Sequence, residues 1–279
     1  MRTLSKRAAS AALMNDNITL FACPLCTEPM QVHELESLTC TANHSFDIAK
    51  QGYINLMPHA TASKYSKELF ASRKAVIDSG LYDPLEEKIA RHIKNAQTIL
   101  DTGCGEGSHL SRIVTQLTGK PIGVGIDIAK EGILAAARYY SEQIWCVGDL
   151  AKSPYAAKSF DAILNILSPA NYDEFKRLLA PGGCVVKVVP QSGYLQELRT
   201  QLYAQSEKET YSNEQTVERF SESFSEVSIE RVTYTLPLPT ELVPALLEMT
   251  PMGWHKAKDA EITLTEITID VDVLIGCIE

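Results

Sequence analysis

Between residues 98 and 205, short apolar runs alternate with longer segments that have the polar and apolar spacing of helices. The runs are rich in β-branched residues and almost free of charge, which is typical of strands buried on both faces. They are TILD, PIGVGIDI, IWCVGD, FDAILNIL and CVVKVV, and the segments that alternate with them are SHLSRIVTQL, KEGILAAARYY, DEFKRLLA and GYLQELRTQLYAQ. This alternation predicts an α/β fold with a mostly parallel sheet covered by helices.

The two ends of the chain depart from this pattern. Near the C-terminus, VSIERVTYTL and ITLTEITIDVDVLIGCIE flank a short helix at ELVPALLEM, which predicts two antiparallel strands on one edge of the sheet. Upstream, KELFASRKAVIDS predicts a helix that ends at Gly80, and a second helix begins with Pro84 in its first turn. Residues 20–57 combine short apolar pieces with Cys, Thr and Pro, which predicts a small β-rich module.

Composition adds limits. The 279 residues are 45% hydrophobic and 22% charged, as in ordinary globular proteins. No apolar run is long enough for a transmembrane helix. Residues 1–14 faintly resemble a transit peptide, but we expect a frayed extension. The seven cysteines are too few and unevenly spaced for a secreted disulfide framework, so we expect a reducing cytoplasm.

The net charge of −9 argues at first against a nucleic-acid partner. The excess is almost entirely C-terminal, because residues 194–279 contain 16 acidic and 6 basic residues, whereas residues 1–94 contain 10 and 11. The front half therefore keeps a weak, salt-sensitive capacity to bind a polyanion.

Cysteine and histidine gather in the stretch FACPLCTEPMQVHELESLTCTANHSF. Cys23 and Cys26 form one closely spaced pair, and Cys40 and His44 form another. Two such turns supply the four tetrahedral positions of a zinc ion, and four protein ligands leave no place for a water molecule. We therefore expect a structural zinc, with His44 preferred over His33 as the fourth ligand. Free buried cysteines or a redox C-x-x-C pair are the alternatives.

The stretch LDTGCGEG follows a predicted strand and opens a helix. Gly103, Gly105 and Gly107 allow a tight turn and a close approach of backbone to a ligand. Asp101 precedes the glycines and Glu106 lies among them. Two carboxylates repel a pyrophosphate and suit a cationic ligand, so the loop favours S-adenosylmethionine (SAM) over NAD.

Further cofactor contacts are expected where the next strands end. Asp127, with Ile128 beside it, lies near the distance at which an acid accepts hydrogen bonds from ribose. Asp149 is a candidate for the adenine amino group and Leu150 for its ring, although Asp149 could instead cap a turn. Asn165 lies at the end of the fourth predicted strand, where the reacting group must lie.

Three segments in this order resemble the RlmA-type 23S rRNA (guanine-N1)-methyltransferases: CPLC…C-x3-H-x-FD-x-AK-x-GY-x-NL, SRKA-x3-SG-x-YDPL and LD-x-GCGEG. The resemblance extends from about Phe21 to the C-terminus, and its combination of motifs is specific. It implies a class I SAM-dependent, Rossmann-like methyltransferase fold with an N-terminal zinc module. It also implies methyl transfer to N1 of a guanine in a 23S rRNA hairpin beside the peptide exit tunnel, near the macrolide site, which connects the family to macrolide resistance.

The resemblance also assigns residues. The zinc ligands of the family match Cys23, Cys26, Cys40 and His44, its cofactor tyrosine matches Tyr82, and its Gly-Glu cofactor pair matches Gly105 and Glu106. A histidine that touches SAM in the enterobacterial branch is replaced by Tyr194, which hints at the branch that methylates a nearby guanine. Family members resemble homodimers whose zinc modules frame an RNA cleft. On this basis we expect basic side chains near the module to contact phosphates, namely Lys50, Lys64, Lys67, Arg73 and Lys74.

These inferences divide the chain into an extension at 1–19, a zinc-binding module at 20–57, a helical linker region at 58–94 and a methyltransferase domain at 95–279. No residue is assigned as a general base, because Asp173 and Glu174 fit the start of a helix better.

Two functional alternatives stay open. A small-molecule SAM-dependent methyltransferase with a structural zinc module would agree with the acidic total charge. A non-catalytic zinc-binding RNA module on an inactive fold would agree less well with the intact cofactor loop, and an NAD oxidoreductase is a more distant third.

Overall fold

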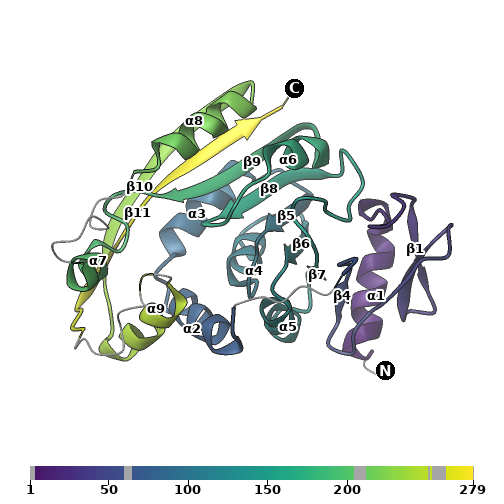
Figure 1. The fold of residues 1–279 in the computed structure, drawn as a ribbon, viewed down its shortest axis with the longest axis horizontal. Coiled ribbons are helices and arrows are strands. Elements are labelled where there is room, and N and C mark those ends of the chain that lie inside the picture. The colour runs from purple at the N-terminus through teal and green to yellow at the C-terminus, as the bar shows by residue number, and fades with distance from the viewer. Residues whose placement is uncertain (1–3, 60–64, 204–211, 251, 253–261, 279) are drawn as a thin grey trace.

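The computed structural model describes residues 4–59, 65–203, 212–250, 252 and 262–278. In this part of the chain, one large sheet forms the body, and a small sheet lies beside it at the N-terminal end (Figure 1). In spatial order, the strands of the large sheet are β10 (Glu226–Pro237), β11 (Glu266–Cys277), β9 (Leu179–Pro190), β8 (Phe160–Ile166), β5 (Thr98–Thr102), β6 (Ile122–Asp127), β7 (Ile144–Val147) and β4 (Tyr53–Asn55).

Strand direction follows the predicted pattern. The strands from β9 to β4 pair in parallel, whereas β11 pairs antiparallel with β9 and β10 antiparallel with β11. The side chains of β11 are almost all buried, while those of β10 are exposed or half-buried along its whole length. The predicted α/β class, with a mostly parallel sheet and an antiparallel edge, is therefore confirmed.

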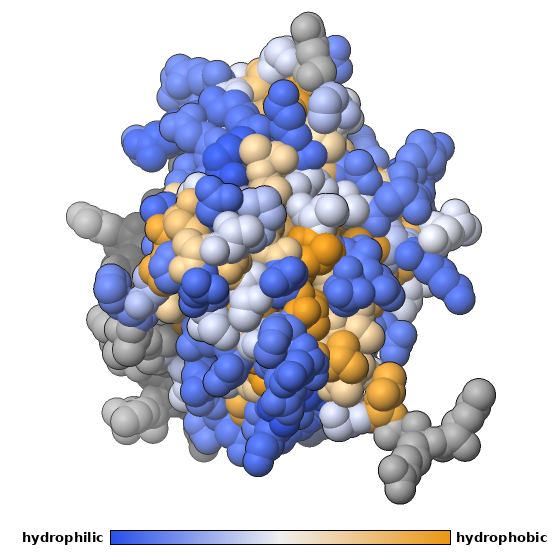
Figure 2. All heavy atoms as spheres, turned by 90° about the vertical axis from the view of Figure 1, so that its right-hand side faces the viewer, coloured by the Kyte–Doolittle hydropathy of each residue, from blue (hydrophilic) through white to orange (hydrophobic). Residues whose placement is uncertain are grey.

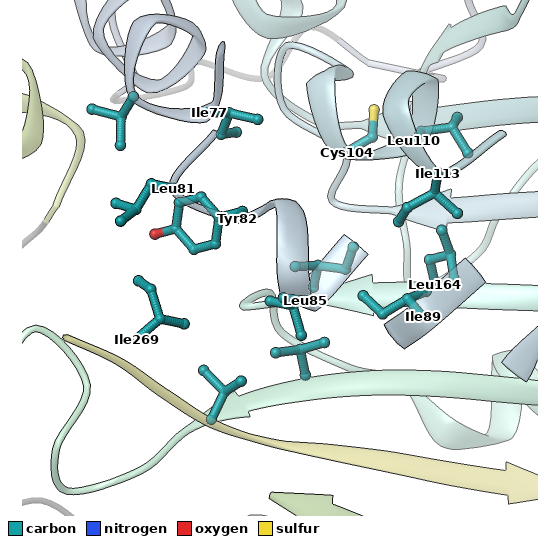
Figure 3. Packing of buried hydrophobic residues seen from close by; sticks show 14 of the residues in the cluster. Ile77, Leu81, Tyr82, Leu85, Ile89, Cys104, Leu110, Ile113, Leu164 and Ile269 are labelled. Atoms are coloured by element: carbon teal, nitrogen blue, oxygen red, sulfur yellow. The ribbon is translucent and has the colours of Figure 1, made fainter. Parts of the chain in front are cut away.

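Helices cover both faces of this sheet. Strand alternation sends Ile99 to one apolar cluster and the adjacent Leu100 to another, so that each face has its own core. The first core includes the contacts labelled in Figure 3, among them Tyr82, Leu85 and Leu164. Its helices are α2 (Lys67–Asp78), α3 (Asp83–His92), α4 (Ser108–Thr115), α5 (Lys130–Tyr139), α7 (Gln196–Tyr203) and α9 (Val243–Met249), while α1 (Lys6–Asp16), α6 (Tyr172–Leu178) and α8 (Glu214–Ser223) cover the second core.

The N-terminal extension is not frayed, and this expectation was wrong for the described residues. Ser5 caps α1 by accepting a hydrogen bond from the backbone of Ala8, and Ala11 and Met14 are fully buried. The Ser10 hydroxyl also donates to the carbonyl of Gly52 at 2.7 Å. The helix contacts both β1 and β7, so it connects the small sheet to the edge of the large one.

The small sheet consists of β1 (Met30–His33), β2 (Ser37–Cys40) and β3 (Ser45–Asp47), joined as antiparallel neighbours in that order. Two 3-10 turns, η1 (Ile18–Leu20) and η3 (Thr240–Leu242), also occur in the described part of the chain. β4 falls inside the segment 20–57 yet pairs with β7 of the large sheet, so that segment contributes to both sheets. Among the described residues, no helix has the length and apolar character needed to cross a bilayer.

Candidate functional site

Four thiol and imidazole groups converge at one end of the small sheet. The Cys23 and Cys40 Sγ atoms each lie 3.4 Å from His44 Nδ1, and the Cys26 and Cys40 Sγ atoms are 3.6 Å apart. A tetrahedral zinc site places neighbouring ligand atoms at about 3.5–3.8 Å, given Zn–S bonds of about 2.3 Å and Zn–N bonds of about 2.0 Å. The four predicted ligands therefore fit a zinc ion, and His33 lies outside the cluster, as expected.

Tight turns bring the ligands together. Thr27, after the first pair, and Asn43, within the second, adopt left-handed backbone with φ of 64° and 62°. The Thr27 N–H donates to the Cys23 carbonyl, and the Asn43 N–H donates to the Cys40 carbonyl. Each turn thus directs its two ligands to the same side.

The glycine loop lies between β5 and α4, at the carboxyl end of the parallel strands. Gly103, Gly105 and Gly107 have φ of 75°, 58° and 80°, which side chains rarely adopt. A Cβ at Gly103 would fall 1.9 Å from Ser168 Oγ, and one at Gly107 would fall 2.3 Å from the ring of Trp145. The loop therefore packs closely against Ser168, which follows β8, and against Trp145 of β7, and glycine is required for this packing.

Asp127, at the end of β6, holds this loop in place. Its Oδ2 accepts a hydrogen bond from Gly105 N at 2.8 Å, and its Oδ1 accepts one from Ala129 N at 2.7 Å. Burial raises the pKa of Asp127 above its ordinary value, although these backbone bonds oppose the shift. Each carboxylate oxygen retains a second lone pair that can accept a ribose hydroxyl.

Buried acids gather behind the loop. Glu106 is fully buried, and neither of its carboxylate oxygens accepts a hydrogen bond from the described residues. Burial also raises the pKa of Asp101 to about 7, against the opposing effect of the Arg73 charge. The unsatisfied buried carboxylate of Glu106 fits a ligand with a cationic amino group, such as SAM.

Arg73 is the nearby cation in this region, and it comes from α2. Its Nε lies 3.0 Å from Glu106 Oε2, without the alignment of a hydrogen bond. Burial alone would lower the pKa of Arg73, but the charges of Glu106 and Asp101 raise it overall. The structure thus directs Arg73 toward the cofactor loop, and not toward solvent as a phosphate contact would require.

Two tyrosines that were assigned by resemblance meet at the side of the site. The hydroxyls of Tyr82 and Tyr194 are 2.7 Å apart, and both side chains are buried. Burial raises the pKa of both phenols. The Tyr82 ring also packs edge-on against His109, whose Nδ1 lies 2.8 Å from Glu86 Oε1.

The remaining strand-end candidates have different roles. Leu150 and Ile128 line the same cavity as the loop. Asp149 accepts a hydrogen bond from Ala151 N at 2.8 Å, which is the turn cap considered as its alternative. Asn165 is fully buried, and its amide donates to the Thr102 backbone and side chain and to the carbonyl of Pro169.

A cavity of about 680 Å³ lies beside the glycine loop. One part is lined by Gly103, Gly105 and Asp127, and the other is lined by Ser168 and Lys187 with parts of α8 and the end of α9. It therefore lies at the strand ends where ligands of open α/β sheets bind. The predicted site missed Lys187, although a single charged residue within the apolar run CVVKVV was an available signal.

The described basic residues that were proposed for RNA contacts differ in their surroundings. Lys50 and Lys67 are exposed, Lys74 bonds to Asp78 and Tyr140, and Lys64 lies outside the described residues. Arg73 is turned inward as described above. Asp173 and Glu174 occupy the first turn of α6, as expected, and Glu174 pairs with Arg177.

Comparison with known proteins decides the family. A zinc-ribbon family model described as "RlmA, N-terminal" matches residues 21–67, and one described as "Methyltransferase domain" matches residues 99–183. A provisionally named 23S rRNA (guanine-N1)-methyltransferase of Bacillus subtilis (strain 168) is 42% identical over 275 residues, which covers 93% of this chain and 98% of that protein. The chain belongs to the 23S rRNA (guanine-N1)-methyltransferase family.

A second member of this methyltransferase family, the 23S rRNA (guanine(748)-N(1))-methyltransferase of Streptomyces fradiae, is 30% identical and covers 88% of this chain and 90% of its own. Among solved structures, Haemonchus contortus phosphoethanolamine N-methyltransferase 2 with S-adenosylhomocysteine has a TM-score of 0.51 at 13% identity, covering 79% of this chain and 61% of its own. That likeness supports the fold alone. The family confirms the resemblance, the class I methyltransferase fold, the SAM cofactor and the zinc module.

Proposed function

We propose that this protein transfers a methyl group from SAM to N1 of a guanine in a 23S rRNA hairpin beside the peptide exit tunnel. The observation that carries the proposal is the single cavity that continues from the glycine loop to Ser168 and Lys187. A guanine that has left its stack can present its Watson–Crick edge in the second part of this cavity.

The chain's own groups then act mainly by positioning. Asp127 fixes the loop and can accept a ribose hydroxyl, while Glu106 and Asp101 offer acceptors for the amino group of the cofactor. SAM supplies a methyl group on a sulfonium that is an excellent leaving group. The remaining task of the protein is to align N1 with that methyl group and to exclude water.

The zinc module is proposed to position the RNA. Lys50 and Lys67 are exposed and can contact phosphates, and Arg219 lines the cavity from α8. Phosphate contacts of this kind orient a substrate without reading its sequence. Lys64 stays a proposed contact, whereas the partners of Arg73 and Lys74 favour roles within the protein.

We further propose a homodimer in the cytoplasm, in which two zinc modules frame the RNA. Figure 2 shows the face that carries the N-terminal module, where hydrophobic side chains are interspersed among hydrophilic ones. The exposed leucines of this module include Leu25 and Leu35, which a second copy could cover. Light scattering of the purified protein, with and without RNA, tests the dimer, and macrolide susceptibility of a deletion strain tests the proposed link to resistance.

The test of the function is nucleoside analysis after methyl transfer in vitro. Purified protein, SAM with a labelled methyl group and 23S rRNA from a deletion strain are combined, and the digested product is separated. We expect the label in N1-methylguanosine, and none with the Gly105→Arg variant. Label in another nucleoside would reject N1 of guanine as the acceptor, and no label from a protein that binds SAM would reject the proposal and favour a small-molecule acceptor.

A further inference from the structure

Lys187 is a buried lysine on β9 that lines the cavity and has no role in the account so far. Its side chain is 3% exposed and lies on a strand whose neighbouring residues are mostly valine. The Nζ atom donates to Asn165 Oδ1 at 2.5 Å and to the Ser168 carbonyl at 3.0 Å, and the residue lines the cavity. No ion pair to Lys187 occurs among the described residues, and burial lowers the pKa of its amine to about 8.

The two hydrogen bonds of Lys187 can both be made by a neutral amine. A neutral amine has two N–H donors and one lone pair, and the two acceptors already named use both donors. The orientation of Asn165 is fixed as well, because its amide nitrogen faces three oxygens, from Thr102 and Pro169. Its Oδ1 must therefore face Lys187, which leaves the third direction of Nζ available to a molecule in the cavity.

Other titratable groups that line the cavity in the described part of the chain are less suited to accept a proton. Asp127 already accepts two backbone hydrogen bonds, and the arginines are permanently charged. Burial raises the pKa of the Tyr172 and Tyr194 phenols, Tyr194 is bonded to Tyr82, and Tyr65 is an exposed side chain. These other groups are Asp127, Arg73, Arg219, Tyr65, Tyr172 and Tyr194.

We propose that Lys187 is a catalytic residue that receives the proton of guanine N1 during methyl transfer, an inference that rests on the proposed function. A bond forms between N1 and the methyl carbon, while the carbon–sulfur bond breaks and its electron pair stays on sulfur. The N1–H bond breaks, and its proton moves to Nζ of Lys187. The products are neutral N1-methylguanine, S-adenosylhomocysteine and a lysine ammonium, which later releases its proton to solvent.

The proposal predicts the pH dependence of a single turnover. Only the neutral amine can act, so the rate should rise with pH, reach half of its maximum near the pKa of about 8 and level off above it. Lys187→Met should lose this inflection and about 100-fold or more of the rate, with unchanged SAM affinity in calorimetry. Lys187→Arg should lose as much, because a guanidinium has no available lone pair. Lys94→Met, which removes an exposed lysine, is the matched control and should behave like the wild type.

A second readout does not depend on any variant. In the wild-type protein with S-adenosylhomocysteine, NMR of labelled lysine should show one amine that titrates near 8, well below the ordinary value of about 10.4. The proposal would be overturned if every lysine amine had an ordinary pKa, if the wild-type rate were independent of pH, or if Lys187→Arg were fully active. If the wild type makes no N1-methylguanine, the proposed function fails; if it does and Lys187→Met keeps the full rate, the inference alone fails.

Discussion

Arg73 Nε lies 3.0 Å from Glu106 Oε2, and this contact connects α2 to the loop between β5 and α4. A helix that the sequence places in the linker region therefore covers the cofactor site. The aromatic ring of Phe70 lies on the same side, 3.3 Å from where a Cβ of Gly105 would be.

The Arg73 contact predicts a stability effect in the absence of RNA. Arg73→Met leaves the Glu106 carboxylate buried without its nearest cation, which should lower the free energy of unfolding by about 2–4 kcal/mol. Lys67→Met, an exposed change on the same helix, should stay within about 0.5 kcal/mol of the wild type. Urea unfolding measures both, and a fully stable Arg73→Met with weakened RNA binding would restore the phosphate-contact interpretation.

SAM binding at the glycine loop and zinc binding at the cysteine cluster should be lost independently of each other. Gly105→Arg introduces a side chain at φ 58° against Phe70 and Arg73, and it should abolish SAM binding. Gly182→Arg is its control, because Gly182 has φ 74° with nothing within 4 Å of a Cβ.

Cys23→Ala should lose zinc and unfold the small sheet while SAM still binds, whereas Cys184→Ala, outside the cluster, should keep both. Calorimetry measures the SAM affinity of each variant, and a zinc assay measures its metal content. Loss of SAM affinity in Cys23→Ala as complete as in Gly105→Arg would refute the independence of the two sites.

Asp101 predicts a pH effect with a definite sign. Its folded pKa of about 7 lies above the unfolded value of 3.8, so the folded state holds this proton more tightly. The stability that this proton contributes is complete below about pH 4 and is lost as the pH rises toward 7. Asp101→Asn should therefore gain stability relative to the wild type across this window, on the order of 1–4 kcal/mol. If the free energies of unfolding of the two proteins changed in parallel between pH 4 and 8, the raised pKa of Asp101 would be contradicted.

The hydroxyl pair of Tyr82 and Tyr194 should be energetically coupled. In a double-mutant cycle with Tyr82→Phe and Tyr194→Phe, we expect a coupling free energy of about 1 kcal/mol, because each hydroxyl is the partner of the other. Unfolding of the four proteins without cofactor gives the value. Strict additivity would mean that the 2.7 Å contact contributes nothing to stability.

The sequence predicted those parts of the fold that depend on local pattern. Unbroken apolar runs identified the central strands, and ligand spacing identified the four zinc-binding side chains. It did not predict β4, because three residues contain no signal for the sheet that they join. The helix α1 was missed for a related reason, since its alanine-rich face becomes informative only when it packs against its neighbours.

The direction of side chains was the second feature that the sequence did not predict. Lys67, Arg73 and Lys74 look alike in the sequence, yet one is exposed, one faces buried carboxylates and one bonds to Tyr140. The fold decides which face of α2 meets the cofactor loop. Likewise, the position of Lys187 in an apolar strand was visible, but its partners Asn165 and Ser168 come from another part of the chain.

The most direct test of the central claim is reverse-transcriptase primer extension on 23S rRNA from a deletion strain, after incubation with the purified protein and SAM. A methyl group on N1 blocks base pairing, so our account predicts a SAM-dependent stop one nucleotide before a single guanine of the exit-tunnel hairpin. The absence of a stop from a protein that binds SAM, or a stop elsewhere in the rRNA, would contradict it.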